Sequence, residues 1–123
     1  TRILQEDYKS NKITSDIKNF TLLGRQVERY PELQIGGPST AWVNAALAEI
    51  EFQIGNEPPS TPALCFLAEK DEIIDNSAVR TFCERWDNCD LISMPEAKHD
   101  LSMEQKSILA KLLFELDKFV KNN

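Results

Sequence analysis

A continuous apolar run over residues 63–68 most constrains how this chain can fold. Its residues, Ala-Leu-Cys-Phe-Leu-Ala, do not alternate with polar ones, which indicates a strand covered on both faces. An amphipathic stretch follows, and Asp75 or Asn76 caps it. Its buried face is predicted to comprise Val79, Phe82, Cys83 and Trp86. A second short apolar run at residues 90–94 completes a strand, helix, strand unit, whose crossover requires parallel strands.

The segments on either side of this unit are predicted to be helical. Downstream, Ser102 and Gln105 have capping-box spacing before an amphipathic stretch, whose apolar residues are Ile108, Leu109, Leu112, Leu113, Leu116, Phe119 and Val120. Upstream, apolar residues recur every three or four positions in two stretches, Ile17, Phe20, Leu23, Val27, Tyr30 and then Val43, Leu47, Ile50, Ile54. Pro31 ends the first helix, and Ser39 or Thr40 caps the second. Residues 55–60 form a linker at which we expect the chain to divide.

Composition and charge limit the partners of this chain. Its 123 residues amount to one domain or less. The net charge of -6 would repel a phosphate backbone, so no nucleic acid is expected to bind. No run approaches the ~20 apolar residues of a membrane-spanning helix, and there is no signal-peptide core, so we expect a cytoplasmic protein. Six basic against four acidic residues in residues 1–30 leave open a peripheral contact with the inner membrane, and homo-oligomerisation is also left open.

The cysteines are odd in number and lack CxxC spacing. Cys65, Cys83 and Cys89 therefore argue against a disulfide framework and against a zinc site. Cys65 falls in the middle of the first strand and Cys83 on the apolar face of a helix, so both are predicted to be small buried residues. Pairing of Cys83 with Cys89 remains open, although the pattern favours a reducing compartment.

One acid and the only histidine lie just beyond the two predicted strands. Asp71 follows the first strand by three residues, and His99 follows the second by five. Because the carboxyl ends of neighbouring parallel strands meet at one edge of a sheet, both side chains are predicted to emerge at that edge. An aspartate that binds one imidazole nitrogen fixes the tautomer and leaves the other nitrogen as a general base. The alternative is a solvated turn acid and a surface histidine.

The pair lacks a nucleophile within this sequence. No GxSxG motif occurs, and Ser39 lacks the second glycine and the preceding strand of a nucleophile elbow, so we interpret it as a helix cap. The predicted buried thiols have no cationic neighbour to activate them. His99, Asp100 and Glu104 are a poor metal-ligand set, and a capping and dipole role is favoured for Glu104. No metal or cofactor is predicted.

Several segments resemble the C-terminal part of the α/β-hydrolase superfamily, and within it the bacterial lysophospholipases and monoacylglycerol lipases. They are TPAL at 61–64, AEKDEIIDN at 68–76, FC at 82–83 and AKHDLSME at 97–104. The segment PELQIGGPSTAWV at 31–43 is similar to the end of the lid region in the lysophospholipase subgroup. The resemblance covers nearly the whole chain.

The resemblance implies a catalytic triad in the order Ser, Asp, His, with Asp71 as the acid and His99 as the histidine. The serine and the oxyanion loop are expected upstream of Thr1. The implied fold is the C-terminal strand, helix, strand, helix portion of an α/β-hydrolase parallel sheet (residues 58–123), preceded by a helical lid region and return segment (residues 1–57). Such a piece is expected to need the missing N-terminal strands or a partner chain, and to be inactive alone.

The implied reaction is acyl transfer from a fatty acyl ester, such as a lysophospholipid or a monoacylglycerol, to serine. Trp42, Ile73 and Leu101 are candidates for lining an acyl pocket, although apolar residues at such spacings are usually core. Another esterase, a thioesterase or a peptidase of the same fold remains open. A non-catalytic interaction module remains open as well.

Overall fold

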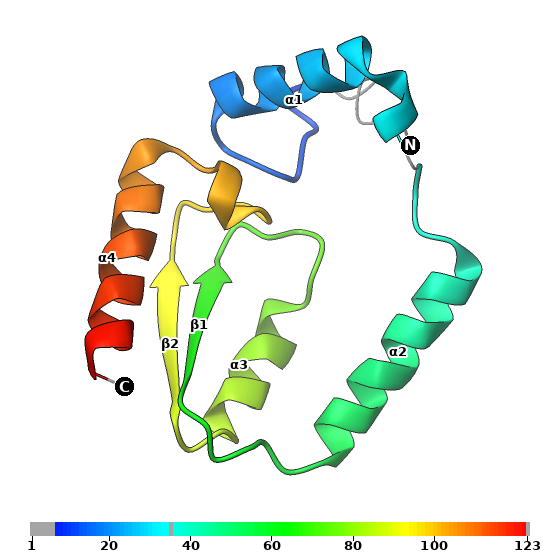
Figure 1. Ribbon diagram of the computed structural model, residues 1–123. Coiled ribbons are helices and arrows are strands. Elements are labelled where there is room, and N and C mark those ends of the chain that lie inside the picture. Colours follow the sequence, from blue (N-terminus) through cyan, green and yellow to red (C-terminus); the bar gives the residue numbers. More distant parts are fainter. Residues whose placement is uncertain (1–6, 35, 123) are drawn as a thin grey trace.

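A computed structural model describes residues 7–34 and 36–122 of the chain. The fold is mixed α/β, and its sheet consists of two parallel strands, β1 (Ala63–Ala68) and β2 (Cys89–Met94). The α-helices in the described part are α1 (Ile17–Arg29), α2 (Thr40–Gly55), α3 (Asn76–Glu84) and α4 (Lys106–Asn122) (Figure 1). Two short 3-10 turns, η2 (Pro31–Leu33) and η3 (Leu101–Met103), complete the order. The predicted sequence of elements is confirmed.

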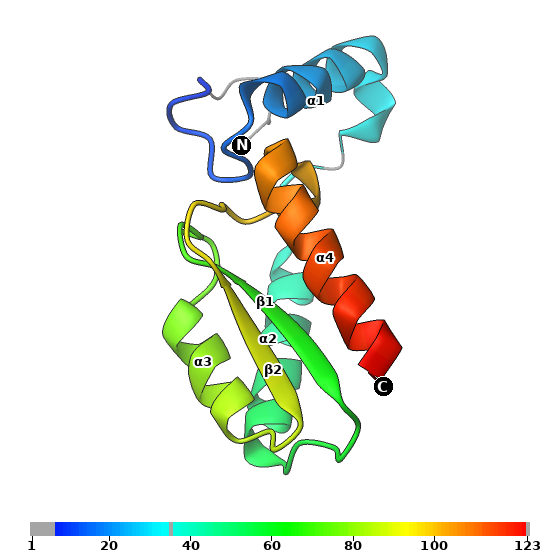
Figure 2. The ribbon, with the colours of Figure 1, turned by 90° about the vertical axis from the view of Figure 1, so that its left-hand side faces the viewer.

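The sheet has helices on both of its faces. Ala63 pairs with Cys89 and Ala68 with Met94, so β2 begins one residue earlier than predicted and the predicted parallel pairing is confirmed. Figure 2 shows α3 on one side of the two strands and α4 on the other. Burial along β1 increases toward Leu67 and Ala68, which point to opposite faces. Both faces of the sheet are therefore covered most completely where the strands end.

The hydrophobic core lies at the same end of the sheet. Ala68, Met94 and Ala97 form a buried cluster, and the partly buried residues packed against it are Phe66, Ile92, Leu101, Ile108 and Leu112. Because side chains alternate along a strand, Leu67 points to the face opposite Phe66 and Ala68, where it is fully buried. The loops that follow β1 and β2 therefore start beside the buried core cluster.

Side-chain caps begin three of the helices. Asp16 caps α1, Ser39 caps α2 and Asp75 caps α3, each by accepting hydrogen bonds from main-chain N–H groups of the first turn. The structure thus selects Ser39 and Asp75 from the predicted alternatives. The predicted capping box is wrong: Ser102 lies inside η3 and its hydroxyl donates to Asp100, whereas α4 begins only at Lys106.

The helix α2 is confirmed, but its apolar residues do not form one packed stripe. Val43, Leu47, Ile50 and Ile54 are exposed, as are Trp42 and Phe52 around the same helix, and no residue of α2 is buried. A helix with apolar residues on more than one side has no single face to bury. Its C-terminal end is anchored by Arg85, which donates to the carbonyls of Ile54 and Asn56 at 2.6 and 2.9 Å.

The turn that leads into α2 depends on glycine. Gly36 has a φ of 76°, in the left-handed region that favours a residue without a Cβ atom. Within the described ranges, no helix is both long enough and apolar enough to cross a membrane.

Candidate active site

Asp71 and His99 meet at the carboxyl end of the sheet. Asp71 lies in the loop after β1 and His99 in the loop after β2, and Nδ1 of His99 is 2.8 Å from Oδ2 of Asp71. The two loops are joined through their backbones, because the Lys70 N–H donates to the Ala97 carbonyl at 2.9 Å. The juxtaposition expected from parallel strands is therefore present.

The Asp71 carboxyl is held from both of its oxygens. Oδ1 accepts from the N–H groups of Ile73 at 2.7 Å and Ile74 at 3.3 Å, while Oδ2 faces the imidazole. Only 2% of the side chain is exposed. Burial raises the pKa of this carboxyl, but the hydrogen bonds from Ile73, His99 and Ile74 outweigh burial and hold the pKa below its ordinary value. Asp71 is thus a fixed carboxylate that can only accept, so Nδ1 of His99 carries the proton.

The imidazole of His99 is oriented on one side and open on the other. Its side chain is 36% exposed. Among the residues that the structure describes, none makes a hydrogen bond to Nε2. A ring whose Nδ1–H is directed at a carboxylate, and whose Nε2 is free, has the arrangement of a general base with its orienting acid.

A second carboxylate, that of Glu69, holds the start of the loop between β1 and α3, here called the acid loop because it carries Asp71. Sequence reasoning missed this network. Glu69 accepts from the Arg80 guanidinium of α3 and, at 2.6 Å, from the Ser93 hydroxyl of β2. These two partners lower the pKa of the Glu69 carboxyl. The network ties the end of β1 to the neighbouring strand and to α3, so the loop that carries Asp71 starts from a fixed position.

Residues 11–15 form a third segment at the site, which the sequence did not predict. The carbonyls of Lys12 and Ile13 accept from the N–H groups of His99 at 3.4 Å and Asp100 at 2.8 Å. The segment is shaped by the buried side chain of Asn11, whose Oδ1 accepts from Ile13 and Thr14 N–H groups. Such asparagine turns have a local sequence signal, but that signal does not reveal what the turn contacts.

The three predicted pocket residues lie in different surroundings. Ile73 is exposed in the acid loop, and Leu101 is half-buried against the core cluster. Trp42 is 63% exposed in the first turn of α2, a helix that stands apart from the site loops in Figure 1. The expectation that such residues are core holds for Leu101 only.

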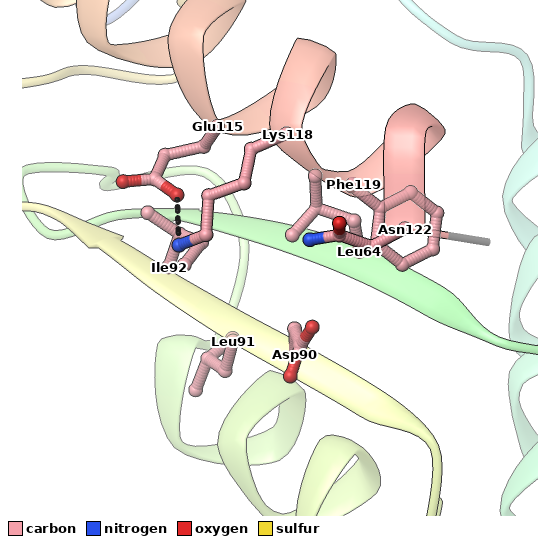
Figure 3. Close-up of a pocket in the computed structure, with 8 residues that line it drawn as sticks. All are labelled: Leu64, Asp90, Leu91, Ile92, Glu115, Lys118, Phe119 and Asn122. Carbon is pink, nitrogen blue, oxygen red and sulfur yellow. Dashed lines mark hydrogen bonds and ion pairs between the residues drawn. The ribbon is translucent and has the colours of Figure 1, made fainter.

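A pocket of about 210 Å³ lies elsewhere, between α4 and the sheet (Figure 3). It is lined by Leu64, Asp90, Leu91, Ile92, Glu115, Lys118, Phe119 and Asn122. Leu64 and Asp90 belong to the beginnings of the strands, so the pocket is at the opposite end of the sheet from Asp71 and His99. It is not a candidate substrate site for this pair.

The acidic residues next to His99 serve the backbone. Asp100 caps η3, and the fully buried Glu104 accepts from the N–H groups of Ser15 and Lys98 at 2.9 and 2.8 Å. Glu104 also accepts from the Gln105 N–H at 3.3 Å. This contact corresponds to the predicted capping role, and it is longer than the other two. No three His, Cys, Asp or Glu side chains in the described ranges are grouped to hold a metal ion.

Together these features define a mixed α/β protein with an Asp–His pair at the carboxyl end of parallel strands. The chain is similar to a probable lysophospholipase L2 of Haemophilus influenzae, with 24% identity over 117 residues. The match covers 94% of this chain and 37% of the length of that relative, and it supports a distant lysophospholipase-like relationship. No protein-family model and no solved structure matches the chain.

Proposed function

We propose that this chain supplies the acid and the histidine of a serine hydrolase that cleaves fatty acyl esters. The observation that carries the proposal is the 2.8 Å contact between Asp71 and Nδ1 of His99, with no hydrogen bond to Nε2 from the part of the chain that the structure describes. The similarity to a protein named as a probable lysophospholipase supports lysophospholipids as the substrate class, and the sequence resemblance adds monoacylglycerols to the proposal. The nucleophilic serine would come from sequence outside these 123 residues.

In the proposed mechanism, Nε2 of His99 takes the proton of the serine hydroxyl as the hydroxyl attacks the ester carbonyl. Asp71 stabilises the imidazolium that forms, and oxyanion-hole N–H groups hold the charge on the carbonyl oxygen. His99 then protonates the departing alcohol, which leaves an acyl-enzyme. Water, activated by the same nitrogen, hydrolyses the acyl-enzyme and restores the serine.

The proposed layout assigns residues 1–57 to a helical lid and its return segment, and residues 58–123 to the C-terminal part of a hydrolase core. Two features support a sheet that continues beyond this chain. Each strand is paired on one edge only within the described residues, and the apolar surface of α2 is exposed. Trp42 and Ile73 are the proposed acyl contacts, whereas the packing of Leu101 favours a core role.

Labelling with a fluorophosphonate probe tests the proposal in the protein at its natural length. The wild-type protein should be labelled, and His99→Ala should abolish the labelling. Glu96→Ala is the matched control, because Glu96 is an exposed residue of the same loop and pairs with Lys70. Labelling that survives in His99→Ala, or no labelling of the wild type, would contradict the proposal.

Substrate comparison tests the finer part. Lysophospholipid and monoacylglycerol should be hydrolysed faster than an acyl thioester or an aminoacyl substrate, and the reverse order would indicate another enzyme of the same fold. The 123-residue chain by itself should show no turnover, because it contains no serine elbow.

A further inference from the structure

Glu104 is a fully buried acid that the proposed reaction does not use. Its side chain is 0% exposed. Oε1 accepts from the N–H groups of Ser15 and Lys98, and Oε2 accepts from the Ser15 hydroxyl. It forms no ion pair with a lysine or arginine among the described residues, although a buried carboxylate is costly unless donors surround it. These donors belong to two segments that are far apart in sequence, so the carboxylate joins them.

One of these contacts fixes the peptide unit that precedes His99. The carbonyl of Ala97 accepts from the Lys70 N–H at 2.9 Å, and the N–H of Lys98 donates to Oε1 of Glu104 at 2.8 Å. These two groups belong to the same planar peptide unit. The unit is therefore held by the acid loop at one end and by Glu104 at the other, and the next residue is His99.

The other contact fixes the segment on which the backbone of His99 rests. Glu104 binds Ser15, and the neighbouring carbonyls of Lys12 and Ile13 accept from the N–H groups of His99 and Asp100. Three successive N–H groups, those of residues 98, 99 and 100, are thus bound either to Glu104 or to the segment that Glu104 holds.

We propose that Glu104 is a positioning residue for His99. Its buried carboxylate holds residues 11–15 against the loop after β2, which carries His99. This contact aligns Nδ1 of His99 with Asp71. The inference deepens the proposed function, since His99 is the general base there. It concerns the orientation of a ring, however, and its test does not require turnover.

The tautomer of neutral His99 reports this alignment. The protein at its natural length, labelled with 15N-histidine, is studied by NMR at about pH 8, where an ordinary imidazole is neutral. His99→Gln identifies the signals of His99. The wild type should show Nδ1 protonated with a low-field proton signal, because the Asp71 carboxylate can only accept. Glu104→Gln places an amide donor among donors, so we expect loss of the low-field signal and a mixture of both tautomers.

Two further variants keep the test decisive. Glu96→Gln changes an exposed acid of the same loop and should leave the tautomer unchanged. Ser15→Ala removes one of the two donors to Oε2, the Ser15 hydroxyl, and leaves the Gln105 N–H, so it should weaken the signal without abolishing it. A folded Glu104→Gln protein with the wild-type tautomer overturns the inference. If Glu104→Gln does not fold by circular dichroism, Ser15→Ala decides: a weakened signal supports the inference, and an unchanged one overturns it.

Failure of the proposed function gives a different result. One such result is a wild-type protein that the fluorophosphonate probe does not label, while the His99 tautomer still changes in Glu104→Gln. That result would contradict the hydrolase proposal and support the positioning role of Glu104. A labelled protein whose tautomer does not respond to Glu104→Gln or to Ser15→Ala retains the hydrolase without the positioning role.

Discussion

The backbone N–H of Lys70 donates to the carbonyl of Ala97 across 2.9 Å, one residue before Asp71 and two before His99. The two loops of the candidate site are therefore joined by main-chain atoms. Because this bond does not depend on side-chain identity, the separation of Asp71 from His99 is a property of the parallel sheet and its loops. The side-chain pair between Lys70 and Glu96 lies at the surface and adds little to it.

In the protein at its natural length, Asp71→Asn should reduce the proposed hydrolysis while the fold remains intact. The amide keeps an acceptor for the Ile73 N–H, but it can also present a donor to the imidazole and so favour the wrong tautomer. We expect kcat to fall by roughly four orders of magnitude, as for the equivalent change in other triads. Steady-state kinetics on a fatty acyl ester measures the effect. Asp75→Asn is the control on the same loop, because asparagine caps helices as well as aspartate does, and its kcat should be unchanged.

Asp71 should also contribute to loss of stability in acid. Burial raises the pKa of its carboxyl, but the hydrogen bonds from Ile73, His99 and Ile74 hold the pKa below its ordinary value of 3.8. A lowered pKa gives stability that is present above the unfolded-state pKa and is lost as the pH falls through the folded-state pKa. The stability advantage of the wild type over Asp71→Asn should therefore shrink below about pH 4. Urea unfolding at a series of pH values measures it, and an advantage that persists undiminished at about pH 2.5 would contradict the assignment.

The three cysteines should be unreactive in the folded protein. Burial raises the pKa of each thiol, and in Cys89 the neighbouring Cys83 adds to burial and raises the pKa to about 12. Since the thiolate is the reactive form, iodoacetamide at about pH 8 should alkylate Cys89 at least about a hundredfold more slowly in the folded protein than in urea. Peptide mass spectrometry follows each site separately. Equal rates with and without urea would show that Cys89 is not shielded.

Leu67→Ala should destabilise the sheet. Leu67 is among the largest fully buried side chains in the described residues, so its truncation leaves a cavity beside β1. We expect a loss of about 2–5 kcal/mol in the free energy of unfolding, measured with urea. Lys121→Ala is the contrasting variant, because it removes only an exposed ion pair with Asp117 and should cost less than about 1 kcal/mol. Equal losses of unfolding free energy in the two variants would show that Leu67 is not part of the packed core.

Local patterns were sufficient to predict the elements and the candidate pair. Helices α1 and α3 and both strands follow from spacing, caps and breakers that act over a few residues. The meeting of Asp71 and His99 follows from one further rule, that consecutive strands joined by a helix lie parallel. The predicted capping box at Ser102 is wrong because the spacing is necessary for such a cap but not sufficient. Ser102 lies in a 3-10 turn instead.

The sequence by itself thus determined that Asp71 and His99 meet, since adjacent loops of a parallel unit must share an edge. Only the tertiary structure decided what holds that site in place. The bonds from Ser15 to Glu104 connect residues 89 positions apart, and such a contact leaves no periodicity or spacing in the sequence. The burial of Glu104 and the exposure of α2 likewise depend on what packs against each element, which is a property of the folded chain.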